Sequence, residues 1–198
     1  MIVVPPGGGE VVGDAPDRRV EILCELDAVH ATWTRMGPGR DGADLHVHRL
    51  HTDVFYVLAG ELTVKLADGE ATVPAGTFAR VPPMVAHGFR NAGSTELRYL
   101  NFHAPGTGFA EYMRGLGRGE RVPFDQEPPP AEGLRPSSEA EIIRGAVEAG
   151  TISVAEAPTP VGEALALYVL EGEGAGTWVQ APEGPIAGTR FVTVSAVP

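Results

Sequence analysis

The chain has 198 residues, which is enough for one domain with a substantial core, or for one domain and a sizeable appendage. Its formal net charge of −11 argues against nucleic acid and anionic membrane surfaces as partners, because both would repel it. Hydrophobic residues make up 43% of the chain, while 26 Gly and 18 Pro favour short strands and tight turns over long helices.

The cellular setting is predicted from what the sequence lacks. Cys24 is the single cysteine, so no disulfide forms within the chain. The first residues have neither the basic segment nor the long apolar segment of a signal peptide, and no apolar run approaches the ~20 residues that cross a bilayer. We therefore expect a cytoplasmic protein.

In chain order, residues 1–18 are rich in Pro and Gly and predict a loosely held N-terminal arm. Residues 19–105 then predict a small antiparallel β-sandwich or barrel, because short strand-like segments alternate with Gly, Pro or Asp-Gly turns. The expected strands are 20–26, 31–36, 53–58, 61–67, 70–73, 77–81, 86–90 and 96–103.

After Pro105 the regular pattern ends. Residues 109–115 predict a short helix, and the Pro-rich and acidic stretch up to 136 predicts a linker, so we expect residues 106–136 to form a helix and linker region. Residues 137–198 predict a strand-rich extension. Near its beginning, Ser137 is placed as the first residue of a capping box and predicts the start of a helix. The strands expected there are 151–156, 165–171, 176–180 and 189–196.

An internal comparison favours a degenerate partial repeat in this extension, although chance similarity between strand sequences is an alternative. A shift of 112 residues aligns 56–58 with 168–170, and 75–77 with 187–189. The same shift places Pro158, Pro160 and Leu165 opposite His46, His48 and Asp53. Because the side chains of Pro and Leu cannot bind a metal, we expect the extension to lack a second metal site.

The sequence His46-Val47-His48, followed by Asp53 and much later by His87, supplies the side chains of a mononuclear metal site. Three imidazoles and a carboxylate suit one divalent iron, zinc, copper, nickel or manganese ion, and they leave a coordination position open for water, dioxygen or substrate. Alternate residues of a strand share a face, so His46 and His48 project together. A bend within 49–52 is then needed for Asp53 to reach them.

Residues 45–62 resemble the first motif of the cupin superfamily, in which HxH is followed by an acidic residue and later by a Gly, here Gly60. Pro74-Ala75-Gly76 with His87 and Asn91 resembles the second motif. The resemblance implies an all-β fold, a jelly-roll β-barrel that carries the C-terminal extension of strands and the short helix. It also implies that His46, His48, His87 and the acidic residue hold a metal inside the barrel.

Asp53 departs from the family pattern, which usually has Glu at this position. The shorter side chain leaves three arrangements open: Asp53 binds the metal, it acts as a catalytic base without binding it, or three histidines hold the ion together with water. His51 is an alternative ligand. We expect His103 to lie on the rim of the barrel, since it ends a strand before Ala104-Pro105, and His30 carries no comparable motif.

Other residues have structural interpretations. Asn91 is expected to cap the turn after its strand. Four apolar residues of the motif region are expected to form the core or the pocket wall: Phe55, Val57, Phe89 and Phe102. Trp33 either packs in the core or lines the cavity. Their apolar character favours an organic ligand over a highly hydroxylated sugar.

The resemblance favours a metal-dependent enzyme similar to the quercetin-dioxygenase-like cupins, with iron as the preferred metal and a small hydroxylated or aromatic substrate. Two other functions are consistent with the residues. A zinc or nickel site acts as a Lewis acid in a non-redox isomerase, lyase or cyclase, and a non-catalytic cupin binds a small molecule. We also expect a homodimer, because cupins commonly pair through barrel edges.

Overall fold

The computed structural model describes residues 1–156, 164–184 and 186–195. The chain divides into two compact units, which we name the central unit (residues 11–144) and the terminal unit (residues 1–10 together with 145–198). These boundaries differ from those expected at residues 18, 105 and 136. The difference arises because strand pairing joins segments that are distant in sequence, and local composition does not report such pairing.

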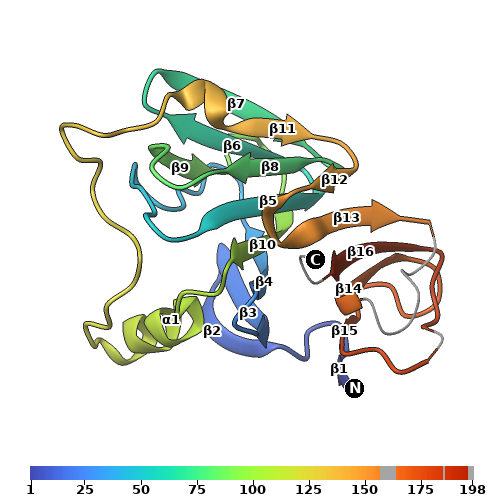
Figure 1. The fold of residues 1–198 in the computed structure, drawn as a ribbon. Coiled ribbons are helices and arrows are strands. Elements are labelled where there is room, and N and C mark those ends of the chain that lie inside the picture. Colours follow the sequence, from blue (N-terminus) through green and yellow to red (C-terminus); the bar gives the residue numbers. More distant parts are fainter. Residues whose placement is uncertain (157–163, 185, 196–198) are drawn as a thin grey trace. The chain divides into compact units, whose positions relative to one another are not determined.

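The predicted all-β architecture is confirmed (Figure 1). One sheet of the central unit has the strand order β11-β8-β5-β10-β4-β3-β2, and a second sheet has the order β7-β6-β9. The strands are β2 (Glu10–Ala15), β3 (Arg18–Glu25), β4 (His30–Met36), β5 (Thr52–Ala59), β6 (Glu61–Leu66), β7 (Gly69–Pro74), β8 (Phe78–Val81), β9 (His87–Arg90), β10 (Leu97–Ala104) and β11 (Glu141–Ile143).

The inner faces of the two sheets meet in one apolar core. Phe55 and Val57 project from β5, and Leu62 and Val64 project from β6. All four side chains are at most 2% exposed, so the core lies entirely out of water. Asp53 shares the face of Phe55 and Val57 because strand residues alternate, and this parity points its carboxylate into the interior.

Two glycines of the predicted turns have the backbone conformation that favours glycine. Gly60 (φ 76°) joins β5 to β6, and Gly76 (φ 80°) precedes β8. At Gly60 a side chain would also clash, because a Cβ there would lie 2.6 Å from the carbonyl oxygen of Glu96. The glycine of the first motif is therefore required by the close approach of β5 and β10 at this end of the sheet.

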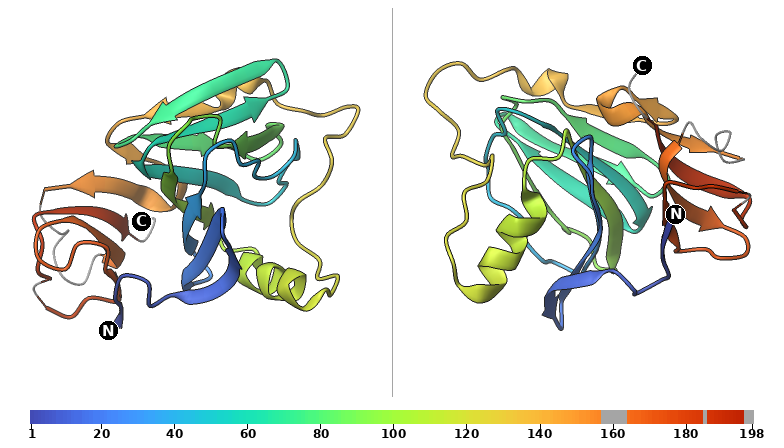
Figure 2. Two further views of the ribbon diagram at one scale, coloured as in Figure 1. Left: turned by 180° about the vertical axis from the view of Figure 1, so that it is seen from behind. Right: turned by 60° about the horizontal axis from the view of Figure 1, so that its bottom comes forward.

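The predicted helix is confirmed as α1 (Phe109–Arg118). It ends where Gly119 takes a left-handed conformation and donates its backbone N–H to the carbonyls of Gly115 and Leu116. The helix start expected near Ser137 is only a 3-10 turn, Ser137–Glu139, because the chain becomes extended at Ala140 and enters β11. Between α1 and β11 the chain follows one side of the central unit (Figure 2).

The terminal unit has a sheet of order β1-β15-β14-β16-β13-β12. Its strands are β1 (Ile2–Val4), β12 (Ala146–Val147), β13 (Ile152–Ala155), β14 (Ala164–Glu171), β15 (Trp178–Gln180) and β16 (Arg190–Ser195), and a 3-10 turn spans Ala149–Thr151. The expected loose arm is thus partly ordered, since Ile2–Val4 pairs with Trp178–Gln180 in antiparallel register. Residues of both chain ends form this one sheet.

The sheets of the two units repeat one strand order, because β8-β5-β10-β4 corresponds to β15-β14-β16-β13. In the central unit Val57 exchanges backbone hydrogen bonds with Gly76 and Thr77. In the terminal unit Val169 makes the same exchange with Gly176 and Thr177. The alignment of residues 75–77 with 187–189 is therefore wrong: the structure aligns them with residues 175–177 across a shorter connection.

Of the three residues expected to replace metal ligands in the extension, Pro158 and Pro160 lie outside the described residues. Leu165 lies in β14. In the described part of the terminal unit β14 passes directly into β15 through residues 172–177, so strands equivalent to β6 and β7 are absent between them.

Candidate metal centre

Two short segments bring three histidines together. His46 and His87 form an antiparallel bridge, in which His46 N donates to His87 O at 2.8 Å and His87 N donates to His46 O at 2.9 Å. Because directly paired residues project on one side, their rings lie side by side with centroids 4.4 Å apart. His48 lies two residues after His46 and turns its Nε2 to within 3.2 Å of His46 Nε2.

The predicted bend between the histidines and Asp53 is confirmed at Arg49 and Leu50. The carboxylate of Asp125 holds it: Oδ1 accepts the Arg49 N–H at 2.9 Å, and Oδ2 accepts the Leu50 N–H at 2.7 Å. Oδ2 also lies 2.9 Å from His51 Nδ1. A residue of the linker region thus fixes the loop that carries the motif histidines.

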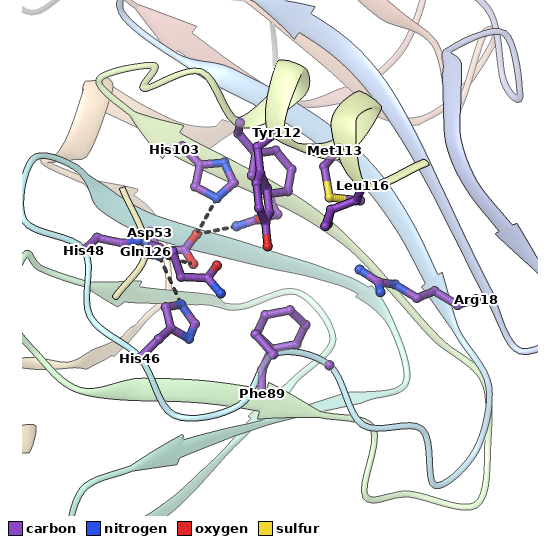
Figure 3. A pocket seen from close by; sticks show the side chains of 14 residues that line it. Arg18, His46, His48, Asp53, Phe89, His103, Tyr112, Met113, Leu116 and Gln126 are labelled. Carbon is purple, nitrogen blue, oxygen red and sulfur yellow. Dashed lines mark hydrogen bonds and ion pairs between the residues drawn. The ribbon is translucent and has the colours of Figure 1, made fainter. Parts of the chain in front are cut away.

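Asp53 projects from β5 toward these histidines (Figure 3). Its Oδ2 atom lies 3.4 Å from His87 Nε2 and 3.7 Å from His48 Nε2. Its Oδ1 atom accepts a hydrogen bond from the side-chain amide of Asn101 on β10. The structure therefore brings all four predicted residues together, and the shorter carboxylate does reach the group that the histidines form.

The hydrogen bonds of the three rings decide which ring nitrogen is free. Backbone carbonyls lie against Nδ1 of each histidine: Asp44 O at 2.7 Å from His46, Val85 O at 3.0 Å from His87, and Asp125 O against His48. A carbonyl only accepts, so each Nδ1 is the donor and each Nε2 carries a lone pair. Three imidazole lone pairs and a carboxylate oxygen therefore converge without a proton between them.

This donor set fits one divalent transition metal. The four ligand atoms lie within 4.8 Å of one another, and the four side chains are between 1% and 5% exposed. Donors bound at about 2.1 Å to one ion stand about 3.0 to 3.4 Å apart, and the separations of 3.2 Å (His46 Nε2 to His48 Nε2) and 3.4 Å (His87 Nε2 to Asp53 Oδ2) match. A cation is the group that would satisfy these buried acceptors.

Burial and neighbouring charges set the protonation of the group. Burial, together with the nearby His87 and His48, lowers the pKa of His46 to about 4, so this imidazole is neutral at pH 7. Burial alone would raise the pKa of Asp53, but the neighbouring His103, His48 and His87 hold it well below its ordinary value. Neutral imidazole and ionised carboxylate are the forms that bind metals.

His51, the alternative ligand, lies beside this group. Its ring centroid is 4.0 Å from that of His48, and its Nδ1 lies 2.9 Å from Asp125 Oδ2 and 3.0 Å from Thr107 Oγ1. Burial lowers the pKa of His51 to about 4. Ligand atoms of His48, His51 and Asp125 also cluster, yet the short contacts among them are hydrogen bonds that support the loop.

The prediction that His103 lies on the rim is wrong. Its side chain is 2% exposed, and its Nε2 lies 3.8 Å from Asp53 Oδ1. The reason is register: His103 pairs directly with Asp53 across β10 and β5, so both project into the interior. His30 pairs with His103 across β4 and β10 and is also buried. Burial lowers the pKa of His103 to about 3, which keeps this ring neutral.

A pocket of about 210 Å³ opens beside His46, His48 and Asp53 (Figure 3). Its polar side includes His46, His48 and Asp53, and its other side is formed by Phe89 and one face of α1. The described lining residues are Arg18, Gly42, Ala43, His46, His48, Asp53, Phe89, Asn101, His103, Phe109, Tyr112, Met113, Leu116 and Gln126.

Sequence reasoning missed several of these residues. Asn101 could have been found from strand parity, since it alternates with His103 on β10. Asp125 and Gln126 gave no signal, because they lie in a Pro-rich segment without periodicity. The helix at 109–115 was predicted, but not that one of its faces lines the pocket. The composition of that segment predicts a linker, whereas its Asp125 supports the loop of the candidate centre.

The expected structural roles are largely as predicted. Asn91 caps its turn, because its side-chain amide donates to the carbonyls of Met36, Gly37 and Thr95. Phe89 is a pocket wall, and Phe102 is fully buried. Trp33 pairs with Leu100 on β10, one position from Asn101, and so lies on the face that points away from the pocket.

Two facing antiparallel sheets with a buried histidine and carboxylate cluster define a jelly-roll protein with a candidate metal centre. Residues 32–103 match the family model of the cupin domain. These residues form a cupin domain, and they include the whole of the candidate centre, from His46 to His87.

A curated relative, quercetin 2,3-dioxygenase of Bacillus subtilis (strain 168), is 29% identical over 117 residues, which cover 58% of this chain and 34% of the relative. The chain thus aligns with about a third of that protein's length. A solved structure from Pseudomonas aeruginosa, described as a glyoxylate induced protein, has a TM-score of 0.58 at 15% identity and covers 98% of this chain and 88% of its own. This likeness shows the fold of the chain.

Another similar structure is an RmlC-like cupin from Shewanella frigidimarina, with a TM-score of 0.44 at 25% identity over 50% of this chain and 86% of its own. In the part of the chain that the structure describes, no helix combines the length and apolar character needed to cross a membrane.

Proposed function

We propose that the central unit is a metal-dependent enzyme whose ion is held by His46, His48, His87 and Asp53. The observation that carries the proposal is the convergence of three Nε2 lone pairs and one carboxylate oxygen in a buried site. Iron is the metal that we favour, and a bound iron ion would supply an open position for substrate or dioxygen.

Asp53 suits the role of ligand better than the role of base. A carboxyl group whose pKa lies well below its ordinary value accepts a proton weakly. The amide of Asn101 holds Oδ1, which leaves Oδ2 facing His48 and His87. We propose that Asn101 orients Asp53 and that His103 excludes water from its far side.

The reaction that we propose is dioxygenation of a small hydroxylated or aromatic compound. The aromatic rings of Phe89, Phe109 and Tyr112 surround the pocket and favour a flat organic molecule. The similarity to quercetin 2,3-dioxygenase supports the same class of reaction. The pocket of about 210 Å³ is small for a three-ring flavonol, so a one-ring substrate is the better fit.

Metal analysis of protein purified without added metal tests the centre. We expect alanine variants of His46, His48 and His87 to lose nearly all bound metal, and Asp53→Ala to lose most of it. His51→Ala is the matched control, since His51 lies beside the candidate centre but is not one of the four residues whose ligand atoms converge there. Full metal content in the three histidine variants would falsify the proposed centre, and loss in His51→Ala would move the ligand role to that residue.

Oxygen uptake tests the reaction. Iron-loaded protein is mixed with catechol in an oxygen electrode, and product formation is compared under air and under argon. We expect turnover under air only, and none from zinc-loaded protein. Product formation that continues without oxygen, or equal activity of the zinc form, would point to the non-redox isomerase, lyase or cyclase instead.

We also propose that the terminal unit is a reduced copy of the central one. The shared strand order and the matching hydrogen bonds of Val57 and Val169 support this interpretation. In its described residues a non-ligating Leu165 stands at the position of Asp53, so the copy would not bind a metal of its own. A homodimer of the chain stays a prediction, which light scattering checks.

A further inference from the structure

Arg18 lies on the opposite side of the pocket from the candidate metal centre. Figure 3 shows its guanidinium directed into the pocket, across from His46, His48 and Asp53. Arg18 begins β3, at the edge of the space between Phe89 and the Leu116 face of α1. Among the described lining residues it is the one arginine, and Asp53 is the one acidic residue.

The guanidinium of Arg18 has no partner among the described residues. Its Nε atom is buried without a hydrogen bond, and no carboxylate of the described chain pairs with it. Neighbouring arginines are paired: Arg19 contacts Asp14 and Glu21, and Arg35 contacts Glu96. Arg18 therefore brings a positive charge to the pocket that no described carboxylate neutralises.

An unsatisfied buried donor on a cation is unfavourable, and a ligand that supplies an acceptor would remove that cost. The planar guanidinium matches a carboxylate with two parallel hydrogen bonds. Phosphate groups are usually held by several donors, such as helix N-termini together with Lys or Arg. The single positive charge of Arg18 therefore favours one carboxylate.

The space between Arg18 and the centre limits the rest of the ligand. A cavity of about 150 Å³ holds one benzene molecule, and the pocket here measures about 210 Å³. One ring with a few substituents fits that volume. Phe89 and Tyr112 supply aromatic contacts for such a ring, and Met113 supplies an adaptable apolar one.

We propose that the pocket binds a small one-ring organic acid, with its carboxylate on the guanidinium of Arg18 and its ring between Phe89 and α1. The opposite end of the acid, a hydroxyl or similar oxygen, then faces the centre formed by His46, His48 and Asp53. This last placement rests on the proposed function, whereas the contact of the carboxylate with Arg18 does not require the metal.

Calorimetry with two probes tests the proposal. The probes are 4-hydroxybenzoate and its neutral isostere 4-hydroxybenzamide, measured with metal-free and with zinc-loaded protein. We expect the acid to bind at least about tenfold more tightly than the amide, as for a charge-assisted hydrogen bond in a partly exposed site. In Arg18→Gln the acid should bind no more tightly than the amide, while Arg98→Gln, an exposed change outside the pocket, keeps the preference.

Equal affinities of the two probes in the native protein, no binding of either, or a preference that survives in Arg18→Gln would overturn the proposal. Tighter binding of phenyl phosphate than of the acid through Arg18 would overturn the choice of a carboxylate. Thermal unfolding of Arg18→Gln checks that the variant is folded, and the preference of the native protein tests the ligand class without any variant. If the proposed metal function is wrong but the proposed ligand is right, the protein will not bind zinc, while the metal-free protein will still bind the acid more tightly than the amide.

Discussion

Replacement of Asp125 by alanine should weaken metal binding although Asp125 is not one of the proposed ligands. Its side chain is 8% exposed, and its carboxylate accepts hydrogen bonds from the Arg49 and Leu50 amides. It also contacts His51 Nδ1, and its own carbonyl lies against His48 Nδ1. The variant therefore releases the bend that separates His48 from Asp53.

The magnitude follows from the hydrogen bonds lost. Each bond to a charged acceptor is worth about 1.5 to 3 kcal/mol, and water replaces part of this at the exposed amides, so we expect a loss of about 2 to 4 kcal/mol in the free energy of unfolding. Residues that orient metal ligands typically change metal affinity by about 10- to 100-fold, and we expect a weakening in that range. Burial raises the pKa of Asp125, but the amides of Arg49 and Leu50 together with His51 lower it overall. Because the folded pKa is lowered, its contribution is complete above about pH 4 and is lost as pH falls through the folded pKa.

The assay is competition for zinc with a chromophoric chelator, combined with urea unfolding of the metal-free protein. Glu127→Gln is the matched control: Glu127 also pairs with Arg49, but both side chains are about half exposed, at 50% and 48%. A pair of that kind contributes less than about 1 kcal/mol, so the control should keep its zinc affinity. Unchanged zinc affinity in Asp125→Ala would refute the reasoning, and so would an equal loss in Glu127→Gln.

The metal-free protein should lose stability as pH falls from about 6.5 to about 4, because burial lowers the pKa values of His46, His51 and His103 and protons then bind preferentially to the unfolded chain. By linkage, each of these residues lowers the free energy of unfolding by about 2 kcal/mol at pH 5. His48, whose pKa is raised, partly offsets this loss. Urea unfolding at pH 7.5 and pH 5 measures the change, and equal stability at the two pH values would contradict the burial of these rings. Gly88→Ala should reduce zinc affinity at least about tenfold, because a Cβ there would lie 2.7 Å from the carbonyl oxygen of Ala43 and push the His46 segment away from β9. The control Gly69→Ala should bind zinc normally, since no atom lies within 4 Å of the added Cβ. Asn91→Ala should lower the free energy of unfolding by about 1 to 3 kcal/mol, since three carbonyls lose their donor, without change in zinc affinity; a large change in affinity would show that this turn does more than support the fold.

Much of the central unit could be predicted because its information is local. Alternation along 53–57 placed Asp53 on the inner face with Phe55 and Val57, and the turn residues Gly60 and Gly76 marked the ends of strands. A bend within residues 49–52 followed from the parity of His48 and Asp53, and the structure places it at Arg49 and Leu50. In each case the residues are close in sequence, so the alternation of side chains along a strand is enough to tell which face each one occupies.

Other features depend on pairing between distant residues. The rim position predicted for His103 was wrong because only the register of β10 against β5 shows which face it occupies. For the proposed repeat, the shift of 112 residues agrees with the hydrogen bonds of Val57 and Val169 but not with those of their partners, Gly76 and Gly176, because the connection after β14 is shorter. The composition of one strand does not predict which residues of the neighbouring strand it pairs with.

By itself the sequence determined the donor set, His46, His48, Asp53 and His87, and the family that the motif indicates. Only the tertiary structure decided what surrounds this set: the carboxylate of Asp125, the amide of Asn101, and the pocket between α1 and Arg18. The physical reason is separation along the chain. Asp125 lies 76 residues from Arg49 and Asn101 lies 48 from Asp53, and contacts over such distances leave no periodic signal in the sequence.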